Sequence, residues 1–258
     1  MFYKNFNRVC TLSAIATVLK ISTFSAFVTE ANAQIFEPPK RHPAPTSTIG
    51  GGRRSGDAQC LNDKIFQPNN AENTNKSPEQ QLTLLLPPNK FGLTILPNPQ
   101  FFAYIPKTSA IAVEFILENP QGKGIAQKRI PLTSTPTIVS AKFDNAPLEV
   151  GKDYKWLISV VCETGDPEDN FSEGIVRRIA PERTLISQLE KASGIEQVSL
   201  YERSGIWHEA IAGLINMRLS QPNRAEIKNG WINLLKSSSL EFLANVPIKT
   251  FVVSSTNH

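Results

Sequence analysis

The chain of 258 residues carries 27 Lys and Arg against 23 Asp and Glu, a formal net charge of +4. The first 33 residues contribute a net +2 of this charge, from Lys4, Arg8, Lys20 and Glu30, so the remainder of the chain carries only +2. This weak balance gives no electrostatic reason to expect a nucleic acid or an anionic membrane as a partner.

The first 33 residues have the pattern of a secretory signal peptide. Lys4 and Arg8 precede a mostly apolar segment at 9–28, and a small-x-small motif then predicts cleavage after Ala33. We therefore expect a periplasmic or extracellular protein. An uncleaved anchor is the alternative, but it needs about 20 uninterrupted apolar residues, and Lys20 interrupts the segment. No later segment is apolar for long enough, so we expect no membrane span in the mature chain.

Removal of the leader leaves two cysteines, Cys60 and Cys162. In an oxidising compartment, an even number of cysteines often pairs. We expect a Cys60–Cys162 disulfide. The alternative is two separate thiols, and only the distance between the two Cα atoms can decide between them.

Residues 34–81 are expected to form a flexible linker. They are rich in Pro, Gly, Ser, Asn and charged residues, and such segments bury too little apolar surface to offset the loss of chain entropy. The spacing of Gly51 and Gly56 matches the start of a phosphate-binding loop, but Asp57 and Ala58 follow where that loop needs Lys and Ser or Thr. We therefore interpret the glycines as part of the linker and expect no nucleotide or other cofactor.

Residues 82–180 contain short apolar runs separated by Pro or Gly turns, which is typical of a β-sandwich. Alternation predicts one buried face in each strand, with Phe102 and Tyr104 on the opposite side of their strand from Phe101. The runs are QLTLLLP, GLTILP, QFFAYIP, AIAVEFILENPQGKGIAQKRIPL, TPTIVSAKF, YKWLISVVC and FSEGIVRRI. In the sixth run, one face carries Tyr154, Trp156, Ile158, Val160 and Cys162; in the fourth, one face carries Ile111, Val113, Phe115 and Leu117.

The segment PLEVGKDYKW supports a particular kind of sandwich. Its Leu148, Gly151 and Tyr154 lie three residues apart before a strand. This resembles the tyrosine corner of fibronectin-III and immunoglobulin-like domains, in which the Tyr hydroxyl bonds to upstream backbone. We therefore expect a fibronectin-III/immunoglobulin-like sandwich, although a fold alone does not specify a function.

Residues 181–250 change to helical periodicity and predict a small α-helical domain, followed by a tail at 251–258. GIWHEAIAGLINMRLSQP resembles the second helix of a tetratricopeptide unit, with Trp207 and Ala210 on the packed face and Pro222 after the helix. No second unit follows, and a solenoid needs at least three. The resemblance therefore implies only a helical hairpin.

His208 and Glu209 begin a near-match to the zinc-protease motif H-E-x-x-H. The position of the second His is occupied by Ala212, and the other two His residues, His42 and His258, lie in no ligand pattern. We therefore expect no metal site. On an amphipathic helix, we expect His208 to be exposed to solvent.

Most of the mature chain resembles an uncharacterised domain family common in cyanobacteria, domain of unknown function 928. The segments that carry the resemblance are GGGRRSGDAQC, PQFFAYIP, VEFILENPQGKGIAQKRIPL, PLEVGKDYKWLISVVC, GIVRRI and SGIWHEAIAGLINMRLSQP. The resemblance implies an exported protein with the same order of Gly/Arg segment, β-domain and helical end. It implies no catalytic residue and no substrate.

Our first hypothesis for function is a non-enzymatic interaction module that binds an envelope protein or polymer. Its candidate contact surface includes the helical end and, if the sandwich leaves their face uncovered, Phe102 and Tyr104. These two residues belong to the core otherwise. A hydrolase is the second hypothesis, because paired carboxylates can catalyse acid–base chemistry. Carbohydrate binding by exposed aromatic residues is the third. The acidic residues of the second hypothesis are Asp153, Glu163, Asp166, Glu168 and Asp169.

Overall fold

The structure is a computed structural model that describes residue 60, residues 77–162 and residues 167–249. The leader, most of the expected linker and the tail at 251–258 therefore lie outside the described residues. Of the expected linker, Pro78–Gln80 form a short 3-10 helix, η2. The Tyr104 hydroxyl donates a hydrogen bond of 2.8 Å to the Glu79 carbonyl oxygen, which attaches this turn to the fold.

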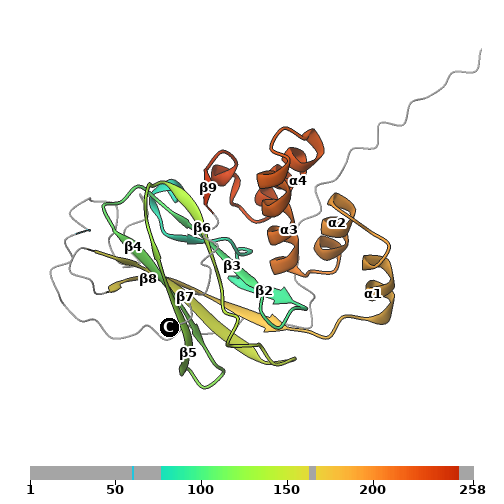
Figure 1. Cartoon of the computed structure of the whole chain (residues 1–258), viewed down its shortest axis with the longest axis horizontal. Coiled ribbons are helices and arrows are strands. Elements are labelled where there is room, and N and C mark those ends of the chain that lie inside the picture. Colours follow the sequence, from blue (N-terminus) through green and yellow to red (C-terminus); the bar gives the residue numbers. More distant parts are fainter. Residues whose placement is uncertain (1–59, 61–76, 163–166, 250–258) are drawn as a thin grey trace, which may run out of the picture. The chain divides into compact units, whose positions relative to one another are not determined.

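Two mixed sheets form the β-region (Figure 1). The four-stranded sheet has the order β1-β3-β6-β9, and the five-stranded sheet has the order β2-β8-β7-β4-β5. Most neighbours are antiparallel, but β2 pairs with β8, and β6 with β9, in parallel. The strands are β1 (Thr83–Leu84), β2 (Phe91–Thr94), β3 (Gln100–Ile105), β4 (Ala112–Glu118), β5 (Gly124–Pro131), β6 (Thr137–Lys142), β7 (Asp153–Val161), β8 (Pro167–Arg178) and β9 (Ile248–Lys249).

The two sheets pack against each other through the alternating residues of their inner faces. The ring centroids of Phe101 on β3 and Trp156 on β7 are 4.9 Å apart, and Trp156 also stacks on Phe115 of β4. The predicted inner face of β7 is confirmed, since all five of its residues from Tyr154 to Cys162 are buried. The fourth predicted run differs at one position only, because Ile111 lies before β4 and is exposed.

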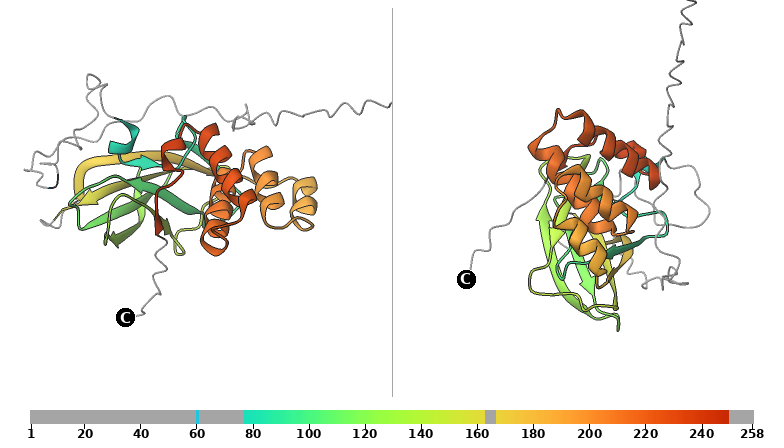
Figure 2. Two further views of the ribbon diagram at one scale, coloured as in Figure 1. Left: turned by 90° about the horizontal axis from the view of Figure 1, so that it is seen from above. Right: turned by 90° about the vertical axis from the view of Figure 1, so that its right-hand side faces the viewer.

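Four helices follow β8, as the change in periodicity predicts: α1 (Arg183–Leu189), α2 (Ile195–Arg203), α3 (Trp207–Ser220) and α4 (Ala225–Ser237). Gly205, in the turn between α2 and α3, has a φ of 70°, a conformation that favours glycine. The helices gather at one end of the sheets (Figures 1 and 2), and α3 packs directly on β2 and β3. Their apolar side chains, including Trp207 and Trp231, belong to the same hydrophobic core as those of the sheets.

Of the two alternatives for Phe102 and Tyr104, an exposed contact surface or the core, burial assigns both residues to the core. Both side chains are buried, because the outer face of the four-stranded sheet is covered as well as its inner face. The Tyr104 ring packs edge-on against Phe242 of the 3-10 helix η3 (Glu241–Leu243), with the ring centroids 5.5 Å apart. The four-stranded sheet is therefore a middle layer in this region, and its aromatic residues serve packing.

A disulfide joins Cys60 to Cys162, with the two Cα atoms 5.5 Å apart. Both residues are buried in the main core. Because Cys162 directly follows β7, the bridge attaches the N-terminal part of the chain to the end of a central strand.

Within residues 60, 77–162 and 167–249, no helix has the length and apolar character needed to cross a lipid bilayer.

Candidate functional site

The first turn of α3 contains the polar residues that the sequence singled out, but the prediction that His208 is exposed is wrong. Trp207, His208, Glu209, Ala210 and Ile211 are all buried, with only 2% of His208 and 7% of Glu209 accessible. This turn lies between the sheets and the other helices. Because the first turn of α3 is enclosed on several sides, none of its faces is exposed to solvent. An amphipathic pattern therefore does not predict which side of this turn is exposed.

Glu209 binds the end of strand β2. One carboxylate oxygen, Oε1, accepts a hydrogen bond from the Thr94 hydroxyl and two more from the backbone N–H groups of Ile95 and Leu96, at 3.3 and 3.2 Å. Three donors on one oxygen make this carboxyl group an anchor between α3 and the β2–β3 connection. Removal of the anchor would leave buried donors without an acceptor, which is costly in a folded protein.

His208 binds the neighbouring strand. Its Nδ1 lies 3.3 Å from the carbonyl oxygen of Gln100, and its ring packs edge-on against Phe101 with the centroids 5.3 Å apart. Strand β1 pairs with β3 only at Tyr104 and Ala103, so this carbonyl lies beyond the end of β1. His208 therefore provides a hydrogen-bond partner for a backbone carbonyl group at the edge of β3, beyond the end of β1.

Burial controls the protonation of the pair. Desolvation lowers the pKa of His208 from 6.5 to about 4, against a smaller opposite effect of the hydrogen bond to Gln100. Desolvation also raises the pKa of Glu209, which its hydrogen bonds only partly offset. The imidazole is therefore neutral at pH 7.

Asp153 does not lie at the end of β7 (Asp153–Val161) that the other acidic residues of the hydrolase hypothesis follow. Asp153 begins β7, whereas Glu163 and Asp166 follow Cys162 at the other end of that strand and lie outside the described residues. Nine residues of strand separate the two ends by about 30 Å. Asp153 instead forms a two-armed ion pair with Arg177 on β8. Within the described parts of the chain, no three His, Cys, Asp or Glu side chains are placed to share a metal ion.

A family comparison identifies the chain. The model of the Domain of Unknown Function (DUF928) family matches residues 49–248. The chain belongs to this family. The match covers the sheets and the helices of the DUF928 chain together, in agreement with their common core.

The other comparisons contribute little to the description of this DUF928 chain. A solved structure, an FMN-binding β-glucuronidase from Facaelibacterium prausnitzii L2-6, is similar with 8% identity and a TM-score of 0.27. The similarity covers 65% of this chain and 32% of the other, so the chain spans about a third of that protein. A comparison with curated proteins found no match.

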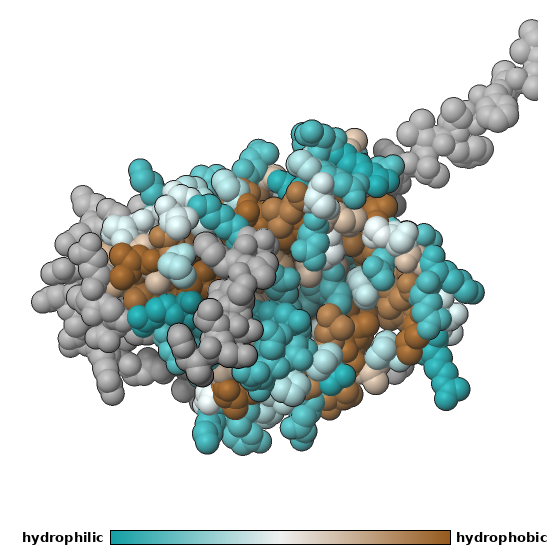
Figure 3. All heavy atoms as spheres, viewed as in Figure 1, coloured by the Kyte–Doolittle hydropathy of each residue, from teal (hydrophilic) through white to brown (hydrophobic). Residues whose placement is uncertain are grey.

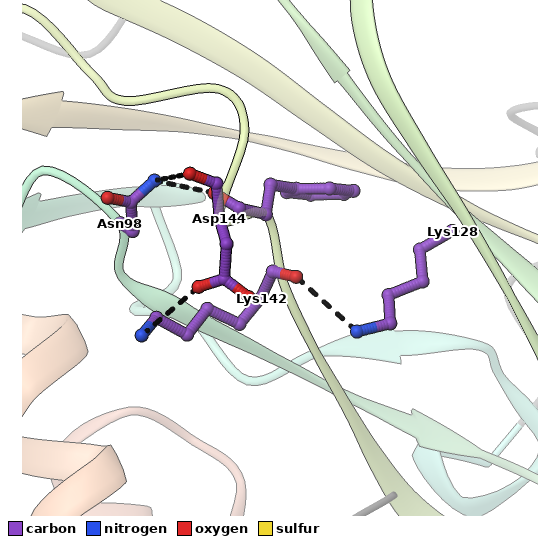
Figure 4. Close-up of polar contacts among 5 residues, drawn as sticks. Asn98, Lys128, Lys142 and Asp144 are labelled. Atoms are coloured by element: carbon purple, nitrogen blue, oxygen red, sulfur yellow. Dashed lines mark hydrogen bonds and ion pairs between the residues drawn. The ribbon is translucent and has the colours of Figure 1, made fainter. Parts of the chain in front are cut away.

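One side of the DUF928 sandwich exposes a strand edge that is protected against further pairing. Strand β5 is the last strand of its sheet. Figure 4 shows Lys128 extending from β5 towards β6, where its Nζ lies 3.5 Å from the Lys142 carbonyl oxygen. At the same corner, Asn98 donates to the Phe143 carbonyl at 2.6 Å, and Lys142 pairs with Asp144. An inward-pointing lysine and a terminal Pro131 are features that disfavour the addition of another strand.

The outer face of the five-stranded sheet is the other candidate surface. Lys155 pairs with Glu118 and Glu173 on the two neighbouring strands, at 2.9 and 3.6 Å, and Arg129 pairs with Glu114. In the register of the sheet, the same face carries the apolar residues Ile116, Leu157, Phe171 and Ile175 between these charges. On the side that Figure 3 shows, hydrophobic residues form separate groups among hydrophilic ones rather than a continuous apolar surface.

Sequence reasoning did not identify the partners of the His208–Glu209 pair. Thr94 and Gln100 lie more than 100 positions from α3 along the chain, and neither has an unusual local pattern. Gly92 is the feature of the sequence that could have indicated this contact. A glycine inside a strand often marks a place where another group approaches the backbone closely.

The first prediction concerns this glycine. A Cβ at Gly92 would lie 2.6 Å from Nε2 of His208 and 3.0 Å from a methyl group of Leu86. Gly92→Ala should therefore destabilise the protein by about 1–3 kcal/mol through overpacking, measured by urea unfolding. Gly124→Ala on β5 is the control, because its Cβ would meet only Ile116 at 3.9 Å. Equal stability of the two variants would contradict the described docking of α3.

Proposed function

We propose that this DUF928 protein is a non-enzymatic interaction module that binds another envelope protein through the outer face of its five-stranded sheet. The observation that carries the proposal is the mixed character of this face, where apolar side chains lie between inter-strand ion pairs. Protein interfaces combine an apolar centre with a polar rim in this way. The 3-10 helix η3 covers Tyr104 on the outer face of the four-stranded sheet, whereas Phe171 on the outer face of the five-stranded sheet is exposed, at 37%.

The burial and the contacts of His208 and Glu209 support a role without catalysis. Both side chains are buried and bind main-chain or hydroxyl groups of the protein itself. They hold α3 in place, which is a sufficient physical reason for their presence. The hydrolase alternative has less support, because Asp153 is paired with Arg177 and lies far from the other acidic residues.

A protein partner is favoured over a carbohydrate. Carbohydrate binding by aromatic residues needs exposed rings, and among the described aromatic residues only Phe171 is exposed, at 37%. A single exposed ring among ion pairs is better suited to contact a protein partner than to stack on successive sugar units.

We further infer a fibronectin-III/immunoglobulin-like type of sandwich. Two observations support this type: the sheets face each other, and the Tyr154 hydroxyl accepts a hydrogen bond of 3.2 Å from the Glu149 N–H, five residues upstream. This is the bond expected of a tyrosine corner. The parallel pairs β2–β8 and β6–β9 are a departure from a purely antiparallel sandwich.

Export through the leader is part of the proposal. Its support is the sequence of residues 1–33, with cleavage after Ala33 and Gln34 as the first residue of the mature chain. Mass spectrometry of the protein recovered from the cell envelope should find a chain that begins at Gln34. Recovery of the full-length chain from the cytoplasm would contradict export.

The binding proposal is tested by cross-linking and capture of the tagged protein from its native envelope. Wild type should capture a specific protein, and Phe171→Asp should reduce its recovery at least tenfold. The control is Ile232→Asp on α4, since Ile232 has a similar exposure of 39% but lies on a helix. Equal recovery with Phe171→Asp would show that the sheet face is not the contact surface. Loss with Ile232→Asp alone would assign binding to the helices.

A further inference from the structure

We propose that His208 is an acid-sensitive latch, whose protonation releases the first turn of α3 from strands β2 and β3 while the centre of the sandwich stays folded. The inference concerns the stability of a contact inside the protein and does not depend on the proposed partner.

The packing around His208 accommodates a neutral ring but not a charged one. Nδ1 has the Gln100 carbonyl as its partner, and this hydrogen bond requires a proton on Nδ1. Nε2 is buried and makes no hydrogen bond. A Cβ on Gly92 would be 2.6 Å from this nitrogen, so the main chain of β2 closes the space in front of it. A proton on Nε2 would therefore be a buried donor, and part of a buried charge, without an acceptor.

Among the described residues, no carboxylate raises the pKa of His208. On α3 itself, Glu209 directs Oε1 towards Thr94, and burial raises the pKa of this carboxyl group. On α2, burial raises the pKa of Glu202 to about 7 and that of Tyr201 above 10. Both carboxyl groups are therefore protonated in the acidic range in which the imidazole would gain its proton.

The surrounding elements also carry cations, and their remaining described carboxylates, Glu173 on β8 and Glu196 on α2, do not shift the pKa of His208. Arg178 of β8 donates to the Leu148 carbonyl at 2.9 Å, and Lys90 precedes β2. Arg203 lies at the end of α2. A positive charge on His208 would gain nothing from these side chains.

The direction of the pH effect follows from the lowered pKa. A histidine with a pKa of about 4 when docked, against 6.5 when exposed, contributes stability that is fully present above pH 6.5 and is lost as the pH falls through 4. His208 on its own should lower the ratio of docked to undocked protein by up to about 300-fold over this range, before the opposing contributions of the neighbouring carboxyl groups. The raised pKa values of Glu209 and Glu202 have the opposite sign, since they favour the folded state in acid. Loss of the contact in acid therefore points to His208.

The test is hydrogen exchange with mass spectrometry between pH 7 and pH 4, corrected for the intrinsic pH dependence of exchange. In wild type, amides of β2 and of the first turns of α3 should lose protection on acidification, whereas those of β4 and β7 should keep it. His208→Gln keeps a side-chain N–H donor but does not titrate, so its α3 protection should not fall on acidification. His258→Gln is the matched control and should behave as wild type.

Two results would overturn the proposal. One is an acid-induced loss of α3 protection in His208→Gln that equals the loss in wild type. The other is a simultaneous loss in β4 and β7, which would be ordinary acid unfolding. If His208→Gln does not fold, the imidazole resonances of the wild type are titrated by NMR instead. A buried His208 ring that titrates near pH 6.5 with α3 still docked would also refute the latch.

Discussion

Trp207→Ala should lower the free energy of unfolding by about 3–5 kcal/mol. Trp207 is completely buried in the core shared by the helices and the sheets, and its Nε1 donates a hydrogen bond of 2.7 Å to the Leu85 carbonyl oxygen. Truncation would create a cavity and remove the partner of this carbonyl. The loss is a large part of the roughly 5–15 kcal/mol by which a domain is stable, and urea unfolding followed by circular dichroism would measure it.

Two controls separate the parts of this effect. Trp207→Phe keeps most of the apolar volume and removes only the N–H donor, so it should cost less than Trp207→Ala. Ile232→Ala removes an exposed side chain of α4 and should change stability by no more than about 0.5 kcal/mol. If Trp207→Ala were as stable as Ile232→Ala, the described packing of α3 would be wrong.

Replacement of both Cys60 and Cys162 by alanine should also cause a large loss of stability. The bridge closes a loop with a sequence separation of 102, and the chain-entropy model gives a stabilisation of about 4–5 kcal/mol for a loop of this length. Alanine is suitable because both cysteines are buried and a serine hydroxyl would need a partner. Thermal unfolding of the oxidised wild type and the double variant would measure the difference.

The redox state of the wild type provides the control for this comparison. Wild type unfolded in the presence of a reductant should resemble the double variant, and the double variant should not respond to the reductant. Mass spectrometry of the non-reduced protein should find neither cysteine available for alkylation. Free thiols at both positions would contradict the bridge.

The strands could be predicted from the sequence because their burial follows a local period. Val113, Phe115 and Leu117 alternate with partly polar neighbours, and all three are buried. The same reasoning was incomplete for β3, where both alternating sets are apolar. Apolar residues on both sides of a strand indicate that both sides are covered, and this signal argued for Phe102 and Tyr104 in the core.

The candidate site could not be predicted because its partners meet only in the folded chain. The Thr94–Glu209 contact joins residues 115 positions apart. No local pattern specifies that a buried carboxyl group of one helix will accept hydrogen bonds from the end of a distant strand. The local pattern therefore predicts that a polar His–Glu pair on a helix is exposed to solvent. In the folded protein, the pair instead links α3 to strands β2 and β3.

The position of β9 in the chain has a consequence for the order of folding. This two-residue strand follows all four helices, yet it pairs with β6, with Ile138 opposite Ile248. Contacts between such distant positions are slow to form, because a long loop must close before they contribute any stability. A nascent chain halted before α3 would lack Trp207, Glu209 and the last strand of the four-stranded sheet. We expect such a chain to remain sensitive to protease, with the native fold appearing only after synthesis passes residue 249.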